Sequence, residues 1–246
     1  MIDIHSHIIP NVDDGSKSME ESISMIKEEL KLGVNSIILT PHFRRRMFET
    51  SSDKIYLSFL NLQEEVKKLN LDIDLYLGQE IYIHSLEGFK KTLEMISNKE
   101  IYTFSNTKYI LIEFSYTDDI DITEAAYMAS VKGYVPIIAH IERYQYINSI
   151  EKVEEIMATG ALIQVNASSV IGKDGSKAKR FIKKLIKKGY VDFVASDIHY
   201  KRINYMKDAY DYVVKKHGEE IANKLFNDNA NKILINEIRG VSNGKK

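Results

Sequence analysis

The stretch M-I-D-I-H-S-H-I-I-P, residues 1–10, begins the chain and carries its first strand signal. Ile2 and Ile4 alternate with polar residues, which is typical of a half-buried β-strand. His5 and His7 follow two residues apart, and the period of two along a strand directs both imidazoles to the same side. The segment therefore predicts a strand whose end presents two histidines together.

Short apolar runs alternate with amphipathic stretches along the rest of the chain. Runs rich in Ile and Val predict seven buried strands, at residues 2–6, 34–40, 73–81, 109–114, 135–141, 161–166 and 191–196. Amphipathic periodicity predicts helices at residues 18–32, 52–69, 86–97, 121–132, 149–158 and 176–188, and from about 204 onward. Strands that alternate with helices are typical of parallel sheets with right-handed crossovers. We expect an α/β fold, a closed or nearly closed parallel β/α barrel, with an open doubly wound sheet as the alternative.

The composition excludes several classes of protein. A chain of 246 residues suits one large domain, and we expect a single domain over residues 1–246. Lys and Arg total 34 against 35 for Asp and Glu, a net charge of −1, whereas nucleic-acid-binding proteins are usually strongly basic. The chain has no cysteine, so disulfide and thiolate chemistry are excluded.

The apolar pattern also bears on where the protein works. No apolar run approaches the roughly 18 residues that a membrane span needs, so we expect no membrane insertion. The N-terminus lacks the basic and apolar regions of a signal peptide. We therefore expect a soluble cytoplasmic protein, and the sequence does not indicate its oligomeric state.

Ionisable side chains gather at the ends of the predicted strands. Glu80, Glu113 and Asp197 end the third, fourth and seventh strands. Five of the seven histidines lie at or just beyond strand ends, namely His5, His7, His42, His140 and His199. In a parallel β/α barrel the carboxyl ends of the strands converge on one face, where active sites lie. We therefore expect these side chains to share one rim of the barrel.

A divalent metal centre is the best explanation of such a rim. Five imidazoles and several carboxylates without cations would shift one another's pKa values strongly, whereas divalent metals take both as ligands. Mixed nitrogen and oxygen ligation suits Mn²⁺, Fe²⁺ or Zn²⁺ and suits Ca²⁺ poorly. Zinc sites rich in thiolate are excluded because cysteine is absent.

Four other features each have two interpretations. Arg44, Arg45 and Arg46 either steer a phosphorylated or acidic peptide or form a solvated loop. The lysine-rich stretch 177–188 predicts an outer helix with a wet face, and contact with an anionic membrane is the alternative. Asp13 is either a turn residue or a support for a metal ligand. Asn166 either lines the site or caps a loop.

The order of motifs resembles the polymerase and histidinol phosphatase (PHP) superfamily, from residue 1 to about residue 236. Within it, the chain is most similar to the bacterial manganese-dependent protein tyrosine phosphatases of capsule and exopolysaccharide operons, the CpsB/CapC/YwqE type. The motifs that carry the resemblance are D-I-H-S-H (3–7), V-D-D-G (12–15), T-P-H (40–42), G-Q-E-I (78–81), L-I-E-F (111–114), A-H-I-E-R-Y (139–144), Q-V-N (164–166) and A-S-D-I-H (195–199).

The resemblance implies a distorted seven-stranded, TIM-barrel-like β/α barrel, the PHP fold, with up to three metal ions, most often Mn²⁺. It implies one ion held by His5, His7, Glu80 and Asp197. A second ion would share Glu80 and add Glu113 and His140, and a third would take Asp14, His42 and His199.

The resemblance also assigns substrate and proton-transfer roles. Arg143 matches an arginine that grips the substrate phosphate. A second family arginine follows the last histidine by about five residues, but here Arg202 follows His199 by only three, which leaves its role open. Asp197 or His199 would protonate the leaving group, and the residues do not choose between them.

The implied activity is hydrolysis of phosphotyrosine, on a bacterial tyrosine autokinase with a tyrosine-rich tail. Common tyrosine phosphatases attack through a thiolate, so a chain without cysteine would have to use metal-activated water instead. The alternatives are a small-molecule phosphomonoesterase of the histidinol-phosphatase type and a non-catalytic phosphotyrosine-binding regulator. A deoxyribonuclease is disfavoured because no basic groove or partner domain is visible.

Overall fold

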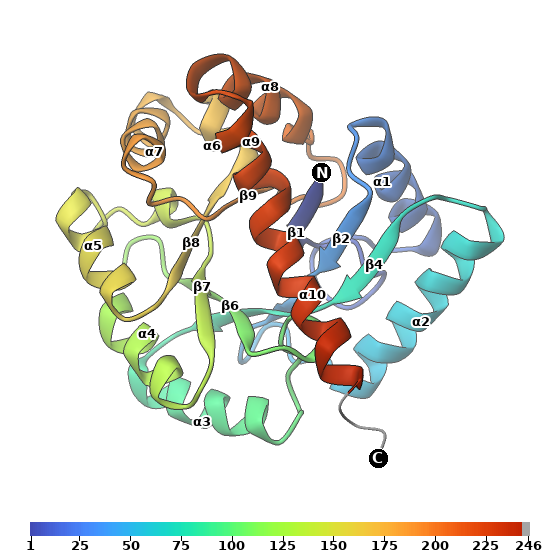
Figure 1. Cartoon of the computed structure of the whole chain (residues 1–246). Coiled ribbons are helices and arrows are strands. Elements are labelled where there is room, and N and C mark those ends of the chain that lie inside the picture. The colour runs from blue at the N-terminus through green and yellow to red at the C-terminus, as the bar shows by residue number, and fades with distance from the viewer. Residues whose placement is uncertain (243–246) are drawn as a thin grey trace.

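The computed structural model describes the backbone of residues 1–242 and the side chains of residues 1–235 (Figure 1). Residues 243–246, the end of the expected domain 1–246, lie outside the described residues. No helix within the described part is long and apolar enough to cross a lipid bilayer.

The named strands pair with one another in parallel only. The strands are β1 (Ile2–Ser6), β2 (Ser36–Leu39), β3 (His42–Phe43), β4 (Asp74–Leu77), β5 (Glu80–Ile83), β6 (Tyr109–Phe114), β7 (Val135–Ile138), β8 (Leu162–Asn166) and β9 (Phe193–Ala195). They form a three-stranded sheet in the order β1-β2-β4 and a six-stranded sheet in the order β3-β5-β6-β7-β8-β9. The six-stranded sheet follows chain order, without the reversal of a doubly wound sheet.

The described strands do not form the expected seven-stranded barrel as one hydrogen-bonded sheet. The expected strand at 73–81 is divided into β4 and β5 by Gly78 and Gln79, and β3 follows β2 after Pro41. Proline lacks the N–H that would continue the ladder. A Cβ on Gly78 would lie only 2.7 Å from the Phe104 ring, so only a glycine fits where the chain passes this side chain. The described sheet is therefore curled and parallel, but in two hydrogen-bonded parts.

Helices surround the curled sheet (Figure 1). They are α1 (Met19–Lys31), α2 (Ser52–Lys68), α3 (Leu86–Ser97), α4 (Ile122–Val131), α5 (Ile150–Ala158), α6 (Ala167–Ile171), α7 (Ser176–Lys188), α8 (Met206–His217), α9 (Glu219–Asn223) and α10 (Asn229–Ser242). Short 3₁₀ turns η1 (Phe104–Asn106) and η2 (Ile141–Arg143) and a π turn η3 (Lys224–Asp228) complete the chain.

The expected helices agree closely with the observed ones, because local signals define their ends. Each of α1–α5 begins after a Ser or Asp whose side chain accepts a backbone N–H of the first turn. The single long helix expected after residue 204 is instead interrupted at Gly218, where φ is +93°. The short elements α6 and β3 were not expected from the sequence.

The interior of the curled sheet has an apolar end. Side chains from several strands pack there against η1 and against α10, which crosses the strands in Figure 1. The buried apolar residues are Ile2, Ile4, Ile38, Phe104, Leu111, Ile137, Ala139, Phe193, Ala195, Ala230, Ile233 and Leu234. This cluster closes one end of the sheet, so the other end is left for polar side chains.

Every second residue of a strand faces the interior of the sheet, so one strand can supply side chains to both the apolar end and the polar end. On β6, Leu111 belongs to the apolar cluster, and Glu113 follows it two residues later on the same face. Phe193 and Ala195 lead in the same way to Asp197. The chain therefore packs a core with residues inside each strand and presents an acid near the end of β6 and just beyond β9.

Candidate metal centre

The structure brings all nine expected metal-binding residues into one network of contacts. Glu80 is its centre and is fully buried. Its Oε1 atom lies 3.2 Å from His5 Nε2 and 3.1 Å from His140 Nε2, and its Oε2 atom lies 2.8 Å from His42 Nδ1. Glu80 begins β5 instead of ending a strand, contrary to expectation. The strand is thus interrupted at Gly78 and Gln79, and the glutamate that begins the next strand lies in the cluster.

His5 and His7 lie side by side, as the sequence predicts, with 3.3 Å between their Nε2 atoms. Strict alternation would place them on the face opposite Ile2 and Ile4. The pairing of β1 with β2 shifts register between Asp3 and Ser6, and such irregularities redirect side chains. This shift is the local reason that both histidines can join the interior.

Two of the metal-site residues have left-handed backbone conformations. His140 has φ +30° and Asp197 has φ +53°, values that non-glycine residues seldom adopt. Both are fixed by hydrogen bonds: the His140 N–H donates to Gln164 Oε1 at 2.7 Å, and the Asp197 N–H donates to the His5 carbonyl at 2.9 Å. Strained positions held in this way are common at functional sites.

Asp14, His42 and His199 form the open side of the cluster. Asp14 Oδ1 lies 3.5 Å from His42 Nε2 and 3.4 Å from His199 Nε2. The Asp14 side chain is 49% exposed, whereas those of His5 and His7 are completely buried. We call these three residues the lip, and the buried residues His5, His7, Glu80, Glu113, His140 and Asp197 the floor.

Within the described residues, three groups have donor atoms close enough to share an ion. The groups are His5, His7 and Glu80; His42, Glu80 and Glu113; and His7, Asp14, His42 and His199. They differ from the expected partition in three respects. His42 replaces His140 beside Glu113, His7 joins the lip group, and Asp197 is absent from the group of His5, His7 and Glu80.

Hydrogen bonds fix the tautomers of three histidines. The Nδ1 atoms of His5, His7 and His199 lie 3.2 Å from Gln164 Oε1, 2.7 Å from Asp13 Oδ2 and 3.1 Å from the Asp197 carbonyl, respectively. With Nδ1–H donating to each acceptor, the Nε2 lone pair is free. Outer acceptors commonly orient metal-binding histidines in this way. Of the two interpretations of Asp13, support of a ligand is therefore the one that its contacts favour.

The groups of the floor shift one another's pKa values. Burial lowers the pKa of the His5 imidazole, but the carboxylates of Glu80 and Asp197 raise it to about 9. Burial, together with the charges on Glu80 and Asp197, raises the pKa of Glu113 to about 9. Burial raises the pKa of Glu80, but His5 and His42 hold it well below its usual range. The carboxylates of the floor thus lie close enough together that their charged forms depend on positive charge nearby.

Buried nitrogen and oxygen atoms of the cluster indicate whether the site fits metal ions. Glu113 Oε2 is buried and has no hydrogen-bond partner among the described residues, and the buried atoms Glu80 Oε2 and His42 Nδ1 lie 2.8 Å apart without the geometry of a hydrogen bond. An unsatisfied buried polar atom costs about 1–3 kcal/mol. Converging carboxylate and imidazole lone pairs are the ligands that divalent transition metals prefer. The residues present therefore fit divalent cations.

Arg143 ends η2 and reaches the cluster from its side. Its Nη1 atom donates to Asp197 Oδ2 at 2.9 Å, and its guanidinium lies 4.9 Å from the centre of the Tyr116 ring. About a third of its side chain is exposed, so N–H groups remain for a ligand. Arg202 lines the same cavity of about 260 Å³ as Arg143 and Asp197, despite its shorter spacing from His199.

The arginines at 44–46 are mostly engaged by the protein itself. The Arg44 guanidinium lies 4.0 Å from the centre of the Tyr82 ring, and Arg45 donates to the Met95 sulfur at 3.4 Å. Arg46 is exposed. A role of Arg44 and Arg45 in binding substrate stays a prediction.

Sequence reasoning missed the role of Gln164 and left that of Asn166 open. Gln164 contacts both His5 and His140, and it lies between Leu162 and Asn166 on the interior face of β8. Asn166 lines the site, because its amide donates to Asp197 Oδ2 at 2.9 Å, and its side chain does not cap α6. The period of two on β8 was the available signal.

Comparisons with known proteins show which family the chain resembles. A family model described as capsular polysaccharide synthesis, CpsB/CapC, matches residues 1–235. The tyrosine-protein phosphatase CpsB of Streptococcus agalactiae is 40% identical over 245 residues, covering 96% of this chain and 99% of that protein. CpsB of Streptococcus pneumoniae is 38% identical over 247 residues, covering 97% and 100%.

A solved structure is also similar over almost its whole length. It comes from a study of YwqE from Bacillus subtilis and CpsB from Streptococcus pneumoniae, described as metal-dependent tyrosine phosphatases. The match has a TM-score of 0.86 at 30% identity and covers 96% of this chain and 95% of that one.

Proposed function

Since the chain belongs to the CpsB/CapC family, we propose that it is a metal-dependent protein tyrosine phosphatase. The observation that carries the proposal is the cluster of nine imidazole and carboxylate side chains with Arg143 beside it. Such a site combines the two requirements of phosphomonoester hydrolysis, which are activation of water and stabilisation of charge on the phosphate oxygens.

We assign the metal ligands to the nine residues His5, His7, Asp14, His42, Glu80, Glu113, His140, Asp197 and His199. Up to three divalent ions would be held, two by the floor and one by the lip. Mn²⁺ is the ion we propose, since mixed nitrogen and oxygen ligands without thiolate suit it, and Fe²⁺ and Zn²⁺ are the other candidates. Bound ions of this kind lower the pKa of a coordinated water to near neutrality.

The remaining steps fall to side chains of this protein. Arg143 is held by Asp197 and presents its free N–H groups to a phosphate, with the planar fork that suits such an ion. Arg202 lines the same cavity and adds a second positive charge. A phenolate leaving group has a pKa of about 10 and so needs little protonation. Asp197 and His199 are the two groups we propose as proton donors.

The substrate we propose is a bacterial tyrosine autokinase that controls capsular or exopolysaccharide synthesis, acted on in the cytoplasm. The family description, capsular polysaccharide synthesis, supports this assignment.

We also propose that the two sheets together form one distorted barrel of seven strands, in which β2 and β3 count as one strand and β4 and β5 as another. Support comes from β3 and β5, which directly continue β2 and β4, and from the parallel bridge between Ser6 and Ile198 that brings β9 beside β1.

Assay of a phosphotyrosine peptide tests the activity. We expect turnover that EDTA abolishes, that Mn²⁺ restores and that iodoacetamide leaves unchanged. Histidinol phosphate should be a poor substrate, and faster turnover of it would favour the small-molecule alternative. Binding of the peptide in Mn²⁺ without turnover would favour a regulator, and turnover after exhaustive chelation would contradict the metal mechanism.

A further inference from the structure

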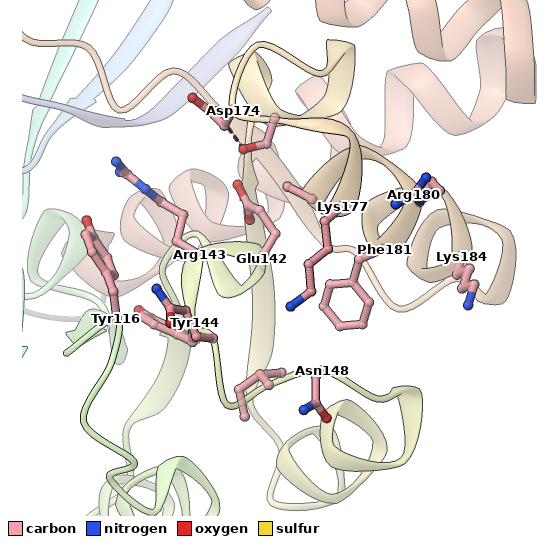
Figure 2. Close-up of a pocket in the computed structure, with 14 residues that line it drawn as sticks. Tyr116, Glu142, Arg143, Tyr144, Asn148, Asp174, Lys177, Arg180, Phe181 and Lys184 are labelled. Atoms are coloured by element: carbon pink, nitrogen blue, oxygen red, sulfur yellow. Dashed lines mark hydrogen bonds between the residues drawn. The ribbon is translucent and has the colours of Figure 1, made fainter.

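A second cavity, of about 500 Å³, begins at Arg143 and extends along α7. We call it the flanking groove and define it by Tyr116, Arg143, Ile147, Lys177, Phe181 and Lys184. In Figure 2, Arg143 and Tyr116 lie on one side of the groove, and Lys177 and Phe181 lie on the other, with Lys184 further along the helix. The groove therefore connects the arginine that we assign to phosphate with the lysine-rich helix.

The face of α7 that lines the groove combines an aromatic ring with cations. Lys177, Phe181 and Lys184 are spaced i, i+4 and i+7, so they fall on one side of the helix. Phe181 is partly buried, whereas both lysines are exposed. Within residues 1–235, neither lysine forms an ion pair, whereas Lys188 pairs with Glu154. The two groove lysines are thus available to a ligand.

The acids that line the groove already have partners. Asp174 accepts from the hydroxyls of Ser168 and Ser169 at 2.5 and 2.7 Å. Glu142 is partly buried and accepts the Asn166 N–H at 2.9 Å. The cavity is lined by four cations, Arg143, Lys177, Arg180 and Lys184, and by only these two acids, so its net charge is positive and it suits an anionic ligand with an apolar part.

The dimensions suit a short peptide. Seven residues separate Lys177 from Lys184, which corresponds to about 10 Å along a helix at 1.5 Å per residue. An extended chain rises about 3.3 Å per residue, so roughly three residues would span this length.

We propose that the flanking groove binds the residues next to the phosphotyrosine in the substrate protein. It selects an apolar or aromatic side chain against Phe181, together with carboxylates near Lys177 and Lys184. This inference rests on the proposed function, because the groove begins at the arginine that binds the phosphate.

The test compares two phosphotyrosine peptides that differ only in the three residues on one side of the phosphotyrosine, Phe-Glu-Glu or Ser-Lys-Lys, prepared for either side. We expect the wild-type protein to have the higher kcat/KM on the acidic peptide, mainly through KM. The double substitution Lys177→Glu and Lys184→Glu should lower this preference about three- to tenfold, because each exposed ion pair contributes little. It should also improve kcat/KM on the Ser-Lys-Lys peptide.

The matched control is Lys183→Glu with Lys187→Glu. It makes the same charge change on another face of α7, where these lysines act on His217 instead of lining the groove. We expect it to leave the peptide preference within about twofold of wild type, as for surface changes elsewhere. Thermal unfolding of both variants confirms that any loss is not one of folding.

Several results would overturn the inference. Equal effects of the two double substitutions would do so, as would the absence of any preference in a wild-type protein that hydrolyses p-nitrophenyl phosphate. In either case the proposed phosphatase activity would stand. If the groove double substitution released the protein from vesicles of anionic lipid without changing the peptide preference, α7 would be a membrane-binding surface. No turnover of any substrate in Mn²⁺ would reject the proposed function itself.

Discussion

The two ends of the parallel strands differ in chemistry although they belong to the same segments of chain. At one end Leu111 and Phe193 pack against other apolar side chains under α10. At the other end, two and four residues further along, Glu113 and Asp197 join imidazoles in the metal centre. The comparison teaches that residues a few positions apart on one strand serve different purposes, packing at one end and chemistry at the other. Substitutions at the apolar end should therefore affect stability, and substitutions at the polar end should affect activity.

The largest effect is expected at the polar end, from Glu80→Gln. The change keeps the shape of the side chain but removes the charge that contacts four histidines. We expect kcat/KM on a phosphotyrosine peptide to fall more than about 10³-fold, beyond the loss of a single stabilising donor. Glu94→Gln, the same change on the exposed face of α3, is the control and should have wild-type activity. Activity of Glu80→Gln within tenfold of wild type would contradict this role.

The matching change at the apolar end is Phe104→Ala. Phe104 is completely buried and packs on Gly78. We expect the free energy of unfolding to fall by about 3–5 kcal/mol, as for other large core truncations. Activity measured well below the unfolding transition should persist. Tyr127→Ala, at a residue 56% exposed, should change stability by less than about 0.5 kcal/mol. Loss of activity in a folded Phe104→Ala protein would break the separation of the two ends.

A smaller effect is expected from Asp13→Asn, which tests whether the histidines of the floor need a hydrogen-bond acceptor behind them. Asp13 accepts from His7 Nδ1 and from the N–H groups of Gly15 and His42. Loss of such an outer acceptor typically costs about 10–100-fold in metal affinity or activity. Titration of activity against Mn²⁺ concentration measures the loss, with Asp72→Asn as an exposed control. An unchanged Mn²⁺ requirement would argue that Asp13 only shapes the turn.

Asp14→Asn should have a milder effect because the lip is open to water. A half-exposed ligand can be replaced by solvent, so we expect a loss of about tenfold that excess Mn²⁺ largely restores, smaller than the losses in buried sites. Metal analysis should then find one ion fewer per chain than in the wild-type protein. A loss as large as that of Glu80→Gln would remove the distinction between lip and floor.

The smallest effect concerns a buried acid away from the metal centre. Burial and the neighbouring Asp3 raise the pKa of Glu29 well above its usual range. A carboxyl whose pKa is raised in the folded state loses stabilisation as pH rises above its unfolded value of about 4.3. We expect Glu29→Gln to raise the free energy of unfolding by about 1 kcal/mol at pH 8 and by less at pH 5. Denaturant unfolding at both pH values measures this, and a pH-independent difference would contradict it.

Much of the fold was predictable because its signals are local. Strand positions follow from runs of Ile and Val, and helix starts follow from capping residues such as Ser18 and Ser149. The division of the strand at 73–81 was not, because no local signal shows that Gly78 packs on Phe104, a residue distant in the chain. The interruption of the last helix at Gly218 carried a local signal that the periodicity of the flanking residues obscured.

The same limit applies to the site. The pattern of histidines and acids identified the candidate ligands, because those side chains recur at the ends of successive predicted strands. Gln164 and Asn166 were missed or left open, since their roles depend on which neighbouring strand they face. The engagement of Arg44 with Tyr82 likewise joins residues that no local pattern connects.

Anomalous diffraction from crystals grown in Mn²⁺ tests the central claim most directly, since it locates the ions themselves. We predict three manganese peaks: two among the floor residues around Glu80, and one at the lip between Asp14, His42 and His199. Crystals of active protein without manganese at these side chains, or with manganese bound elsewhere, would contradict the account.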